Sequence, residues 1–358
     1  MSDIKCDIIL PICDQFDFTK NCIDSIMANT FTPYRLIVIN NGKNESTKAY
    51  LGEIKKALGD NLVVIENPTN FGWVKALNQG IAISTAPYLC FQNDDTVVTR
   101  NWLGKMINIL ARDERIGIVN PSWEGRLKHM SIDEYGACLE KRYAVQYIET
   151  DWARGFSVVL KKKVIEKIGG IDEIYGLAYF DDVDFSVRAI NAGFLVVLAL
   201  DTYVYHHRNV TFFQILKGSK WNELHEKNKL IFYKRWGRPL KISVIVDRKN
   251  CGDRSSINSI ADTIFYLARK QHHIDIWSPC RFGKDNFKHT NINVMSFGPL
   301  TPFLAEIVIY LNGRKRQEKR YAAIFRYGKL SGKDYDSYIR STVDSLSEKT
   351  KEGINAQM

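Results

Sequence analysis

The sequence lacks the features of membrane-spanning, secreted and disulfide-stabilised proteins. Its longest apolar run, residues 194–200, is far shorter than the roughly 20 residues of a membrane-spanning helix. Asp3, Lys5 and Asp7 interrupt the N-terminal segment, which therefore has no signal-peptide pattern. The seven cysteines show no close metal-type spacing, and several lie in apolar segments, as small buried thiols do in a reducing compartment. We therefore expect a cytoplasmic protein.

Several loops that bind nucleotides in other proteins are also missing. No Gly-x-Gly-x-x-Gly turn follows the first predicted strand, which argues against a dinucleotide-dependent dehydrogenase, and no Walker-type loop occurs. No recognition motif for nucleic acid accompanies the positive charge, so we expect no nucleic-acid partner. What remains is a globular composition with 45% hydrophobic residues, and a chain of 358 residues is long enough for two domains.

The net charge of +10 is distributed unevenly. Residues 1–240 carry 30 Lys and Arg against 28 Asp and Glu, whereas residues 241–358 carry 20 against 12, a net +8. Much of this excess lies in the basic run 314–320, Arg-Lys-Arg-Gln-Glu-Lys-Arg. Two interpretations are open: a solvated helix face, or attraction to anionic lipid or a lipid-linked acceptor, with peripheral contact at the inner face of a membrane.

Strand and helix patterns alternate along the chain, which predicts an α/β fold with a mostly parallel sheet and right-handed crossovers. The pattern restarts near Arg238-Pro239, so we expect one domain at 1–238 and a smaller α/β unit at 239–358. The predicted strands are residues 6–13, 34–39, 62–65, 86–91, 116–120, 154–160, 195–200, 241–247, 274–277 and 292–294, and the predicted helices are 19–29, 47–58, 72–82, 102–111, 162–168, 181–193 and 255–269.

An acidic step, Asn93-Asp94-Asp95, follows the apolar strand at 86–91. Carboxylates at the end of a buried strand are costly to desolvate unless something compensates their charge. Ligands of open α/β sheets bind beyond the carboxyl ends of the strands, and Mg²⁺ or Mn²⁺ commonly joins carboxylates to substrate phosphates there. The alternative is an acidic turn that caps the next helix.

Further motifs precede and follow this acidic step along the chain. A strand ends at Pro11 before it, and a second acidic cluster and a histidine pair follow it. In chain order the motifs are Ile8-Ile9-Leu10-Pro11-Ile12-Cys13, Val38-Ile39-Asn40-Asn41-Gly42, residues 70–80 with Asn70, Lys75 and Asn78, Asn93-Asp94-Asp95, Gly169-Gly170-Ile171-Asp172-Glu173 with Asp181-Asp182-Val183-Asp184, and His206.

Together these motifs resemble the inverting nucleotide-sugar glycosyltransferases of family two, in particular rhamnosyltransferase-like members. The resemblance covers about residues 5–235 and implies the GT-A fold, a Rossmann-like domain with a mostly parallel sheet. It implies a nucleotide-sugar donor of the UDP or dTDP type and a saccharide or lipid-linked acceptor. It places the donor against Pro11, Asn40, Asn41, Asn70, Lys75, Asn78, Asn93 and Asp94.

The resemblance also implies a metal site at Asp95 and His206. Imidazole is a poor ligand for Mg²⁺ and an acceptable one for Mn²⁺, which favours Mn²⁺ over Mg²⁺ as the cofactor. His207 is the alternative ligand, because side chains alternate along a strand and only one of the pair can face the site. Two departures from the family's pattern matter: Asn40 stands where the family has a base-contacting aspartate, and Asn93 replaces the first aspartate of the metal motif.

Transfer with inversion needs a base for the acceptor hydroxyl. Asp182 aligns with the family's catalytic aspartate and Asp181 is the reserve, whereas helix capping and a solvated position are the plainer roles for Asp184. On the acceptor side we expect Trp152 and Gly155.

These observations predict a metal-dependent inverting glycosyltransferase of bacterial surface-polysaccharide synthesis, of the O-antigen or capsule type. A non-catalytic module that binds a sugar nucleotide or polysaccharide is the alternative, with Asn40 and Asn93 as signs of decay. A nucleotidyltransferase is a weaker alternative, because Ile12-Cys13-Asp14-Gln15 is not the Gly-rich basic loop that it needs. The second unit begins like the first half of a GT-B glycosyltransferase and is too short for a second half, which suggests a fragment of a longer bifunctional enzyme.

Overall fold

The computed structural model describes residues 4–126, 129–207, 220–247, 254–279, 287–314, 320–327 and 333–355. By its internal contacts the chain divides into two units. Unit 1 comprises Met1–Ile148 and Trp152–Lys229, and unit 2 comprises Glu149–Asp151 and Leu230–Met358. The expected boundary at 238 for the catalytic domain stays a prediction.

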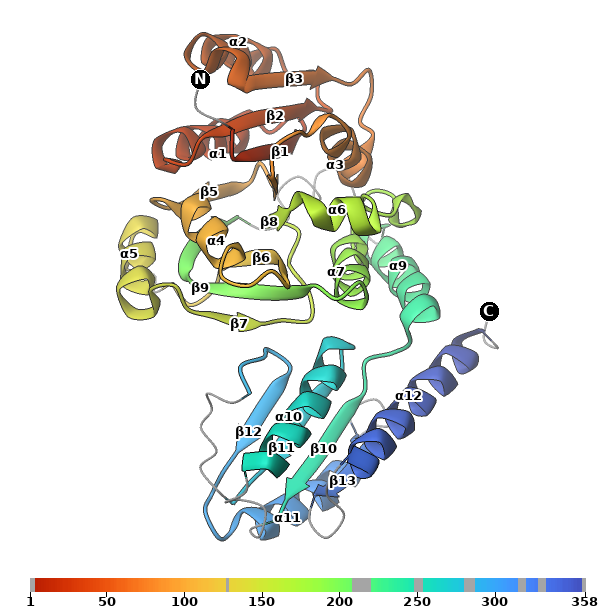
Figure 1. Ribbon diagram of the computed structural model, residues 1–358. Coiled ribbons are helices and arrows are strands. Elements are labelled where there is room, and N and C mark those ends of the chain that lie inside the picture. Colours follow the sequence, from red (N-terminus) through yellow and green to blue (C-terminus); the bar gives the residue numbers. More distant parts are fainter. Residues whose placement is uncertain are drawn as a thin grey trace. The chain divides into compact units, whose positions relative to one another are not determined.

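Unit 1 is built on a nine-stranded, mostly parallel sheet (Figure 1). The strand order is β3-β2-β1-β4-β8-β6-β9-β5, with β7 paired to β9. The strands are β1 Cys6–Ile12, β2 Tyr34–Asn40, β3 Leu62–Glu66, β4 Tyr88–Gln92, β5 Thr96–Val98, β6 Ile116–Ser122, β7 Tyr147–Glu149, β8 Ser157–Lys161 and β9 Leu195–His206.

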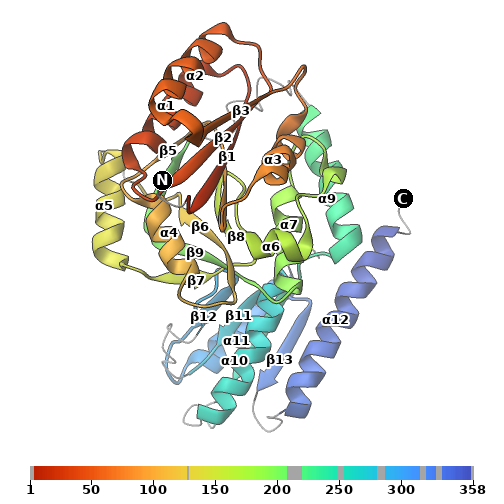
Figure 2. The same cartoon turned by 45° about the horizontal axis from the view of Figure 1, so that its top comes forward.

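Helices cover both faces of this sheet, as Figure 2 shows for α1 and α2 on one face and α3 on the other. Strand β1 shows how the sequence achieves this: Ile8 and Leu10 pack in the core with α1, and Ile9 between them packs in the core with α3. The helices are α1 Phe16–Asn29, α2 Glu45–Leu58, α3 Gly72–Ile83, α4 Trp102–Leu110, α5 Ile132–Tyr143, α6 Lys162–Ile168, α7 Asp181–Asn191 and α9 Lys220–Trp236, with the short 3₁₀ helices η1 Gly59–Asn61 and η2 Glu173–Tyr175.

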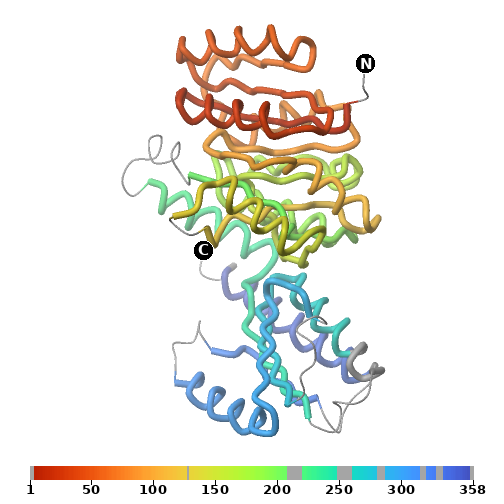
Figure 3. The backbone as a smooth tube through the Cα atoms, turned by 90° about the vertical axis from the view of Figure 1, so that its left-hand side faces the viewer, coloured from red at the N-terminus to blue at the C-terminus, as the bar shows by residue number. Residues whose placement is uncertain are grey.

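Unit 2 has a second, four-stranded parallel sheet in the order β12-β11-β10-β13. The backbone trace in Figure 3 shows α11 on one side of this sheet and α10 and α12 on the other. The elements are β10 Lys241–Val246, α10 Arg254–Arg269, β11 His273–Trp277, β12 Ile292–Met295, α11 Thr301–Gly313, β13 Ala323–Tyr327 and α12 Lys333–Asn355. This is the strand order of one half of a doubly wound fold, and the likeness to a GT-B half stays a prediction.

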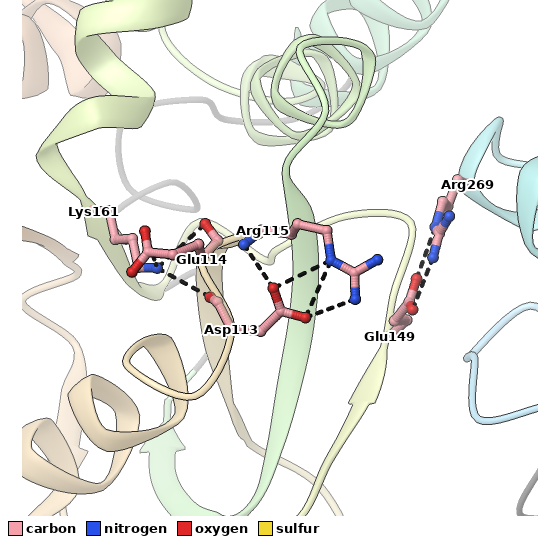
Figure 4. Close-up of polar contacts among 6 residues, drawn as sticks. All are labelled: Asp113, Glu114, Arg115, Glu149, Lys161 and Arg269. Atoms are coloured by element: carbon pink, nitrogen blue, oxygen red, sulfur yellow. Dashed lines mark hydrogen bonds and ion pairs between the residues drawn. The ribbon is translucent and has the colours of Figure 1, made fainter.

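The segment Glu149–Asp151 belongs to unit 2 because its polar groups bond there. Arg269 makes a bidentate ion pair with Glu149 at 2.8 and 2.9 Å, shown in Figure 4, and Gln271 donates to the Asp151 carbonyl. The same figure shows a contact inside unit 1, where the Lys161 ammonium donates to the backbone carbonyls of Asp113 and Glu114.

The predicted fold class is confirmed, and the differences concern single elements. Sequence patterns missed β5, β7, α5, α9, α11, β13 and α12. Helix α5 could have been found, because Ser131 and Glu134 form a capping box at its start. Strand β8 begins at Ser157 rather than at 154, and β9 continues without a break to His206.

Among the described residues no helix is both long enough and apolar enough to cross a membrane. Most of the basic run, residues 315–319, lies outside the described residues.

Gly80 fixes how closely α3 approaches β1. A Cβ atom at this position would lie 2.3 Å from Ile9 Cγ2, so we expect Gly80→Ala to lower the free energy of unfolding by about 1 to 3 kcal/mol. Gly52 in α2 is the matched control, since a Cβ there would meet nothing within 4 Å and alanine favours the helix by about 0.5 to 1 kcal/mol. The free energy of unfolding in urea should fall for Gly80→Ala and rise for Gly52→Ala. Equal changes in the two variants would contradict the close packing of α3 on β1.

Candidate active site

Asp95 and His206 come together because the short strand β5 pairs with the end of the long strand β9. β5 begins directly after Asp95 and runs antiparallel to the end of β9, with Thr96 opposite His206. His206 Nε2 lies 3.1 Å from Asp95 Oδ1, yet this buried oxygen accepts no hydrogen bond from any described residue. The Asn93 amide nitrogen lies 3.5 Å from the same imidazole nitrogen, and a flip of this amide would present its oxygen instead.

This group of donors fits a divalent cation. A buried carboxylate oxygen without a hydrogen bond is costly, and a bound cation removes that cost. The described part of the chain holds no cluster of three or more His, Cys, Asp or Glu side chains suited to a metal. Asp95 and His206 therefore offer two side-chain ligands, with the Asn93 amide beside them, and a metal site at these residues stays a prediction.

Phe156 orients His206. The two rings stack with their centroids 4.8 Å apart and an angle of 12° between their planes. His207, the alternative ligand, instead packs edge-on against Phe18 and Tyr205. The structure thus turns His206 toward Asp95 and His207 toward aromatic side chains.

Asp94 does not lie among the predicted metal ligands. Its carboxylate accepts a hydrogen bond from Thr19 Oγ1 in α1 at 3.0 Å. Burial, together with the charge of Asp95, raises the pKa of Asp94 to about 7. Its bond to α1 gives Asp94 a structural position, and a direct contact with the donor stays a prediction.

Asp181 and Asp182 open helix α7, where Asp181 is buried and Asp182 is half-buried. Asp182 Oδ2 accepts the Gly155 N–H at 2.9 Å and Oδ1 accepts the Val183 N–H at 2.9 Å, so the carboxylate is held in one orientation. Burial raises the pKa of both carboxyls above their ordinary range, and the charge of Asp182 raises that of Asp181 further. A raised pKa suits a general base that works near neutral pH.

Asp184 differs from its expected role. It is fully buried, bonds to Arg188 Nε at 2.8 Å and accepts the Tyr175 hydroxyl at 3.1 Å. Arg188 also donates to the carbonyls of Ile168 and Gly170. The expectation of a solvated position was therefore wrong, because this carboxylate is needed to neutralise a half-buried guanidinium that ties α7 to the end of α6.

Gly155 and Phe156 connect the two halves of the site. The Gly155 N–H holds Asp182, while Phe156 stacks on His206 and its carbonyl accepts the Asn93 N–H at 2.8 Å. Gly155 thus contacts the proposed base, and the adjacent Phe156 contacts two of the predicted metal ligands, Asn93 and His206. Gly155, which we expected at the acceptor, has an observed role as the backbone donor that positions Asp182.

Arg154 was missed by sequence reasoning. Its guanidinium lies between the rings of Trp123 and Trp152, at 4.0 and 4.4 Å from their centroids, and its charge lowers the pKa of Asp182 in opposition to burial. The stacking on Trp123 depends on tertiary structure, so no sequence pattern indicated it. Trp152 therefore lies next to a cation at the edge of the site, and its contact with an acceptor stays a prediction.

A small pocket adjoins the two carboxyls of α7. The space not filled by atoms there is about 280 Å³, a volume that includes open solvent. Most of its lining is apolar, with Ser186, Asp181 and Asp182 as the polar side chains. The remaining lining residues are Trp73, Leu77, Phe91, Ala153, Gly155, Val158, Ile171 and Phe185.

Among the residues predicted to contact the nucleotide sugar, Pro11 lies buried in β1 and pairs with Ile39 of β2. Asn40, at the end of β2, accepts the Gly42 N–H and donates to Glu66 Oε2 at 2.8 Å. An aspartate at position 40 would place two carboxylates at hydrogen-bond distance, which accounts for the amide here. This departure from the family's pattern therefore has a structural reason other than decay.

The other asparagines predicted to contact the nucleotide sugar also form hydrogen bonds within the protein. Asn41 accepts from Asn67 Nδ2 at 2.7 Å, and Asn70 accepts the Gly72 N–H at 2.8 Å. Asn78 exchanges two hydrogen bonds with the backbone of Ile171, so it ties α3 to the segment before η2. Lys75 is exposed on α3. Roles of these side chains in donor binding stay predictions.

Asn228 of α9 is a second residue that sequence reasoning missed. Tyr179 and Phe180, directly before Asp181, both have positive φ angles, 71° and 65°, which are strained for bulky residues. The buried Asn228 amide donates to the carbonyls of Tyr175, Ala178 and Tyr179 and so holds this strained turn. No sequence pattern signals such a contact across about 50 residues.

We expect Asn228→Ala to lower kcat about 10- to 100-fold with little change in donor affinity, because the turn that places Asp181 and Asp182 is released. Steady-state kinetics and calorimetric titration of the donor nucleotide separate the two quantities. Asn222→Ala on the same helix is the control. An unchanged kcat in the folded Asn228 variant would contradict the positioning role.

The fold of unit 1 is that of GT-A glycosyltransferases. It is similar to the structure of GalNAc-T7 with UDP, GalNAc and Mn²⁺, with a TM-score of 0.51 and 13% identity over 66% of this chain and 48% of that one. It is also similar to the mannosyltransferase PcManGT from Pyrobaculum calidifontis in complex with GDP-Man and Mn²⁺, with a TM-score of 0.50 and 16% identity over 66% of each chain.

Residues 7–169 match the family model of glycosyl transferase family 2. Unit 1 therefore contains a glycosyltransferase domain. The O-antigen biosynthesis protein RfbC of Myxococcus xanthus is 25% identical over 228 residues, which are 58% of this chain and 18% of RfbC. Glycosyltransferase AglE of Haloferax volcanii is 21% identical over 203 residues, 56% of this chain and 66% of AglE.

The chain spans only a small part of some relatives. Besides RfbC, an uncharacterized glycosyltransferase of Haemophilus influenzae is 30% identical over 99 residues, and these cover 28% of this chain and 30% of that protein. The predicted family and the predicted enzyme class are confirmed by these matches. Donor, acceptor and pathway are proposals.

Proposed function

We propose that this chain is a metal-dependent, inverting glycosyltransferase that moves a sugar from a nucleoside-diphosphate donor, of the UDP or dTDP type, to a saccharide or lipid-linked acceptor. One observation carries the proposal. Gly155 and the adjacent Phe156 link the proposed base, Asp182, to the proposed metal ligands Asn93, Asp95 and His206. A binding module would need neither an oriented carboxylate of raised pKa nor its connection to a metal site.

In the proposed reaction the acceptor hydroxyl attacks the anomeric carbon as the bond to the departing diphosphate breaks. Asp182 takes the hydroxyl proton, and a single displacement inverts the anomeric centre. The N–H groups of Gly155 and Val183 hold the carboxylate in place for this transfer.

Asp95, His206 and the Asn93 amide would hold the cation. When bound, Mn²⁺ or Mg²⁺ supplies positive charge that stabilises the leaving diphosphate. The imidazole among the donors favours Mn²⁺, and the two structural neighbours described above were solved with Mn²⁺.

We also propose a role in bacterial surface-polysaccharide synthesis, at the inner face of the membrane. The name of the Myxococcus relative supports it, and so does the net charge of +8 at residues 241–358, which would attract anionic lipid.

Release of nucleoside diphosphate from a panel of nucleotide sugars, with Mn²⁺ and with EDTA, tests the proposal. We expect one donor class to be turned over, slowly with water and faster with a mixture of saccharide and lipid-linked acceptors. Tight binding of a donor without any turnover would favour the binding module instead.

A further inference from the structure

Helix α11 of unit 2 exposes an apolar face. Phe303 and Tyr310 are 65% and 63% exposed, and Leu300, at the N-cap, is 63% exposed. Ile307 and Leu311 are also exposed, and the spacing 300, 303, 307, 310 and 311 puts all five side chains on one side of the helix. The exposed Phe297 precedes the helix.

The opposite side of α11 is apolar as well. Ala305 is buried against Ile245 of β10 and Trp277 of β11, with Leu304 and Ile309 packed at the same small core. A helix on the surface of a soluble domain normally has a polar outer face, and one that is apolar all round is covered on both sides. Within the described residues Glu306 is the one acidic residue of this helix, and it is paired with Arg326.

Positive charge flanks the apolar face. Arg314 follows the helix, and its guanidinium lies 4.8 Å from the Tyr310 ring and donates to the Tyr310 hydroxyl. The sequence continues with the basic run that ends at Arg320. Aromatic and aliphatic side chains on one face with Arg and Lys at its border are typical of helices that lie in the interface of an anionic membrane.

We propose that the α11 face, formed by Leu300, Phe303, Ile307, Tyr310 and Leu311, inserts into the interfacial region of an anionic lipid bilayer, with Arg314 at the headgroups. This assigns a surface to the membrane contact in the proposed function. The binding itself does not depend on glycosyl transfer, so the two proposals can fail separately.

Co-sedimentation of the full chain with lipid vesicles tests the assignment. We expect binding to vesicles of phosphatidylcholine with phosphatidylglycerol and much weaker binding to phosphatidylcholine alone. The variant Phe303→Ser should lower the partition coefficient at least about tenfold, since a large apolar side chain no longer enters the bilayer. Arg314→Glu should weaken binding severalfold, and high salt should remove this difference.

Phe31→Ser is the matched control, because Phe31 is 59% exposed on unit 1 and should leave vesicle binding unchanged. Since Phe303 is exposed, its variant should keep the circular dichroism spectrum of the parent. Failure of the parent to bind anionic vesicles, or equal binding by Phe303→Ser, would overturn the proposal. So would a concentration-dependent dimer without lipid that Phe303→Ser abolishes, because the face would then bind a second copy.

Discussion

Asp95→Ala is expected to lower metal-dependent sugar transfer by at least about 100-fold. Asp95 is the carboxylate that lies 3.1 Å from His206, and its Oδ1 is buried without a hydrogen bond from the described residues. Removing it leaves an imidazole and an amide, which hold a hard cation weakly. Assays of nucleoside diphosphate release over a range of Mn²⁺ concentrations measure the effect, and Mn²⁺ should restore EDTA-treated parent enzyme better than Mg²⁺.

Asp60→Ala provides the control for this variant, since Asp60 is an exposed aspartate in η1. It should keep the parent's rate and Mn²⁺ dependence. Full activity of the parent in EDTA, or an unchanged Mn²⁺ response in Asp95→Ala, would rule out the assigned metal site.

Asp182→Asn should lower kcat by about 10²- to 10⁴-fold while the donor binds as before, because the amide cannot take the acceptor proton. Asparagine has the shape of aspartate, and its oxygen can still accept one of the two N–H groups that hold the carboxylate. Asp181→Asn should lower kcat less, since Asp181 is only the second candidate for the general base. A kcat of Asp182→Asn near the parent's would exclude Asp182 as the base.

The pH dependence follows from the same carboxyl. A general base works when deprotonated, so the rate falls as the pH falls through its pKa. Burial raises the pKa of Asp182, which places the acidic limb of the kcat profile above the range of an ordinary aspartate, about pH 4. Asp182→Asn should lose this limb in its residual activity, whereas a limb that persists would belong to another group.

The sequence predicted the parts of the site that lie at strand ends. The pattern of apolar strands places Asn93 and Asp95 directly after a strand, and the family resemblance adds His206. The pairing of β5 with β9 brings Asp95 and His206 together. The strand β5 itself, three residues long, was missed. Short strands carry too little periodicity to be recognised, although they can fix the geometry of a site.

Contacts between side chains of distant segments could not be predicted. Glu66 explains why position 40 carries an amide, and Asn228 holds a turn about 50 residues earlier in the chain. In both cases the reason for the residue is a single hydrogen bond, or a few, formed only after folding. The apolar outer face of α11 was equally hidden, because an all-round apolar helix gives no amphipathic pattern.

Anomalous X-ray scattering from crystals grown with a nucleoside diphosphate and Mn²⁺ tests the central claim most directly. The proposed site predicts one strong manganese peak at a coordination distance of roughly 2 to 2.5 Å from Asp95 Oδ1 and His206 Nε2, with diphosphate oxygens as further ligands. A bound nucleotide whose diphosphate lies away from Asp95 and His206, with no manganese between these side chains, would contradict it.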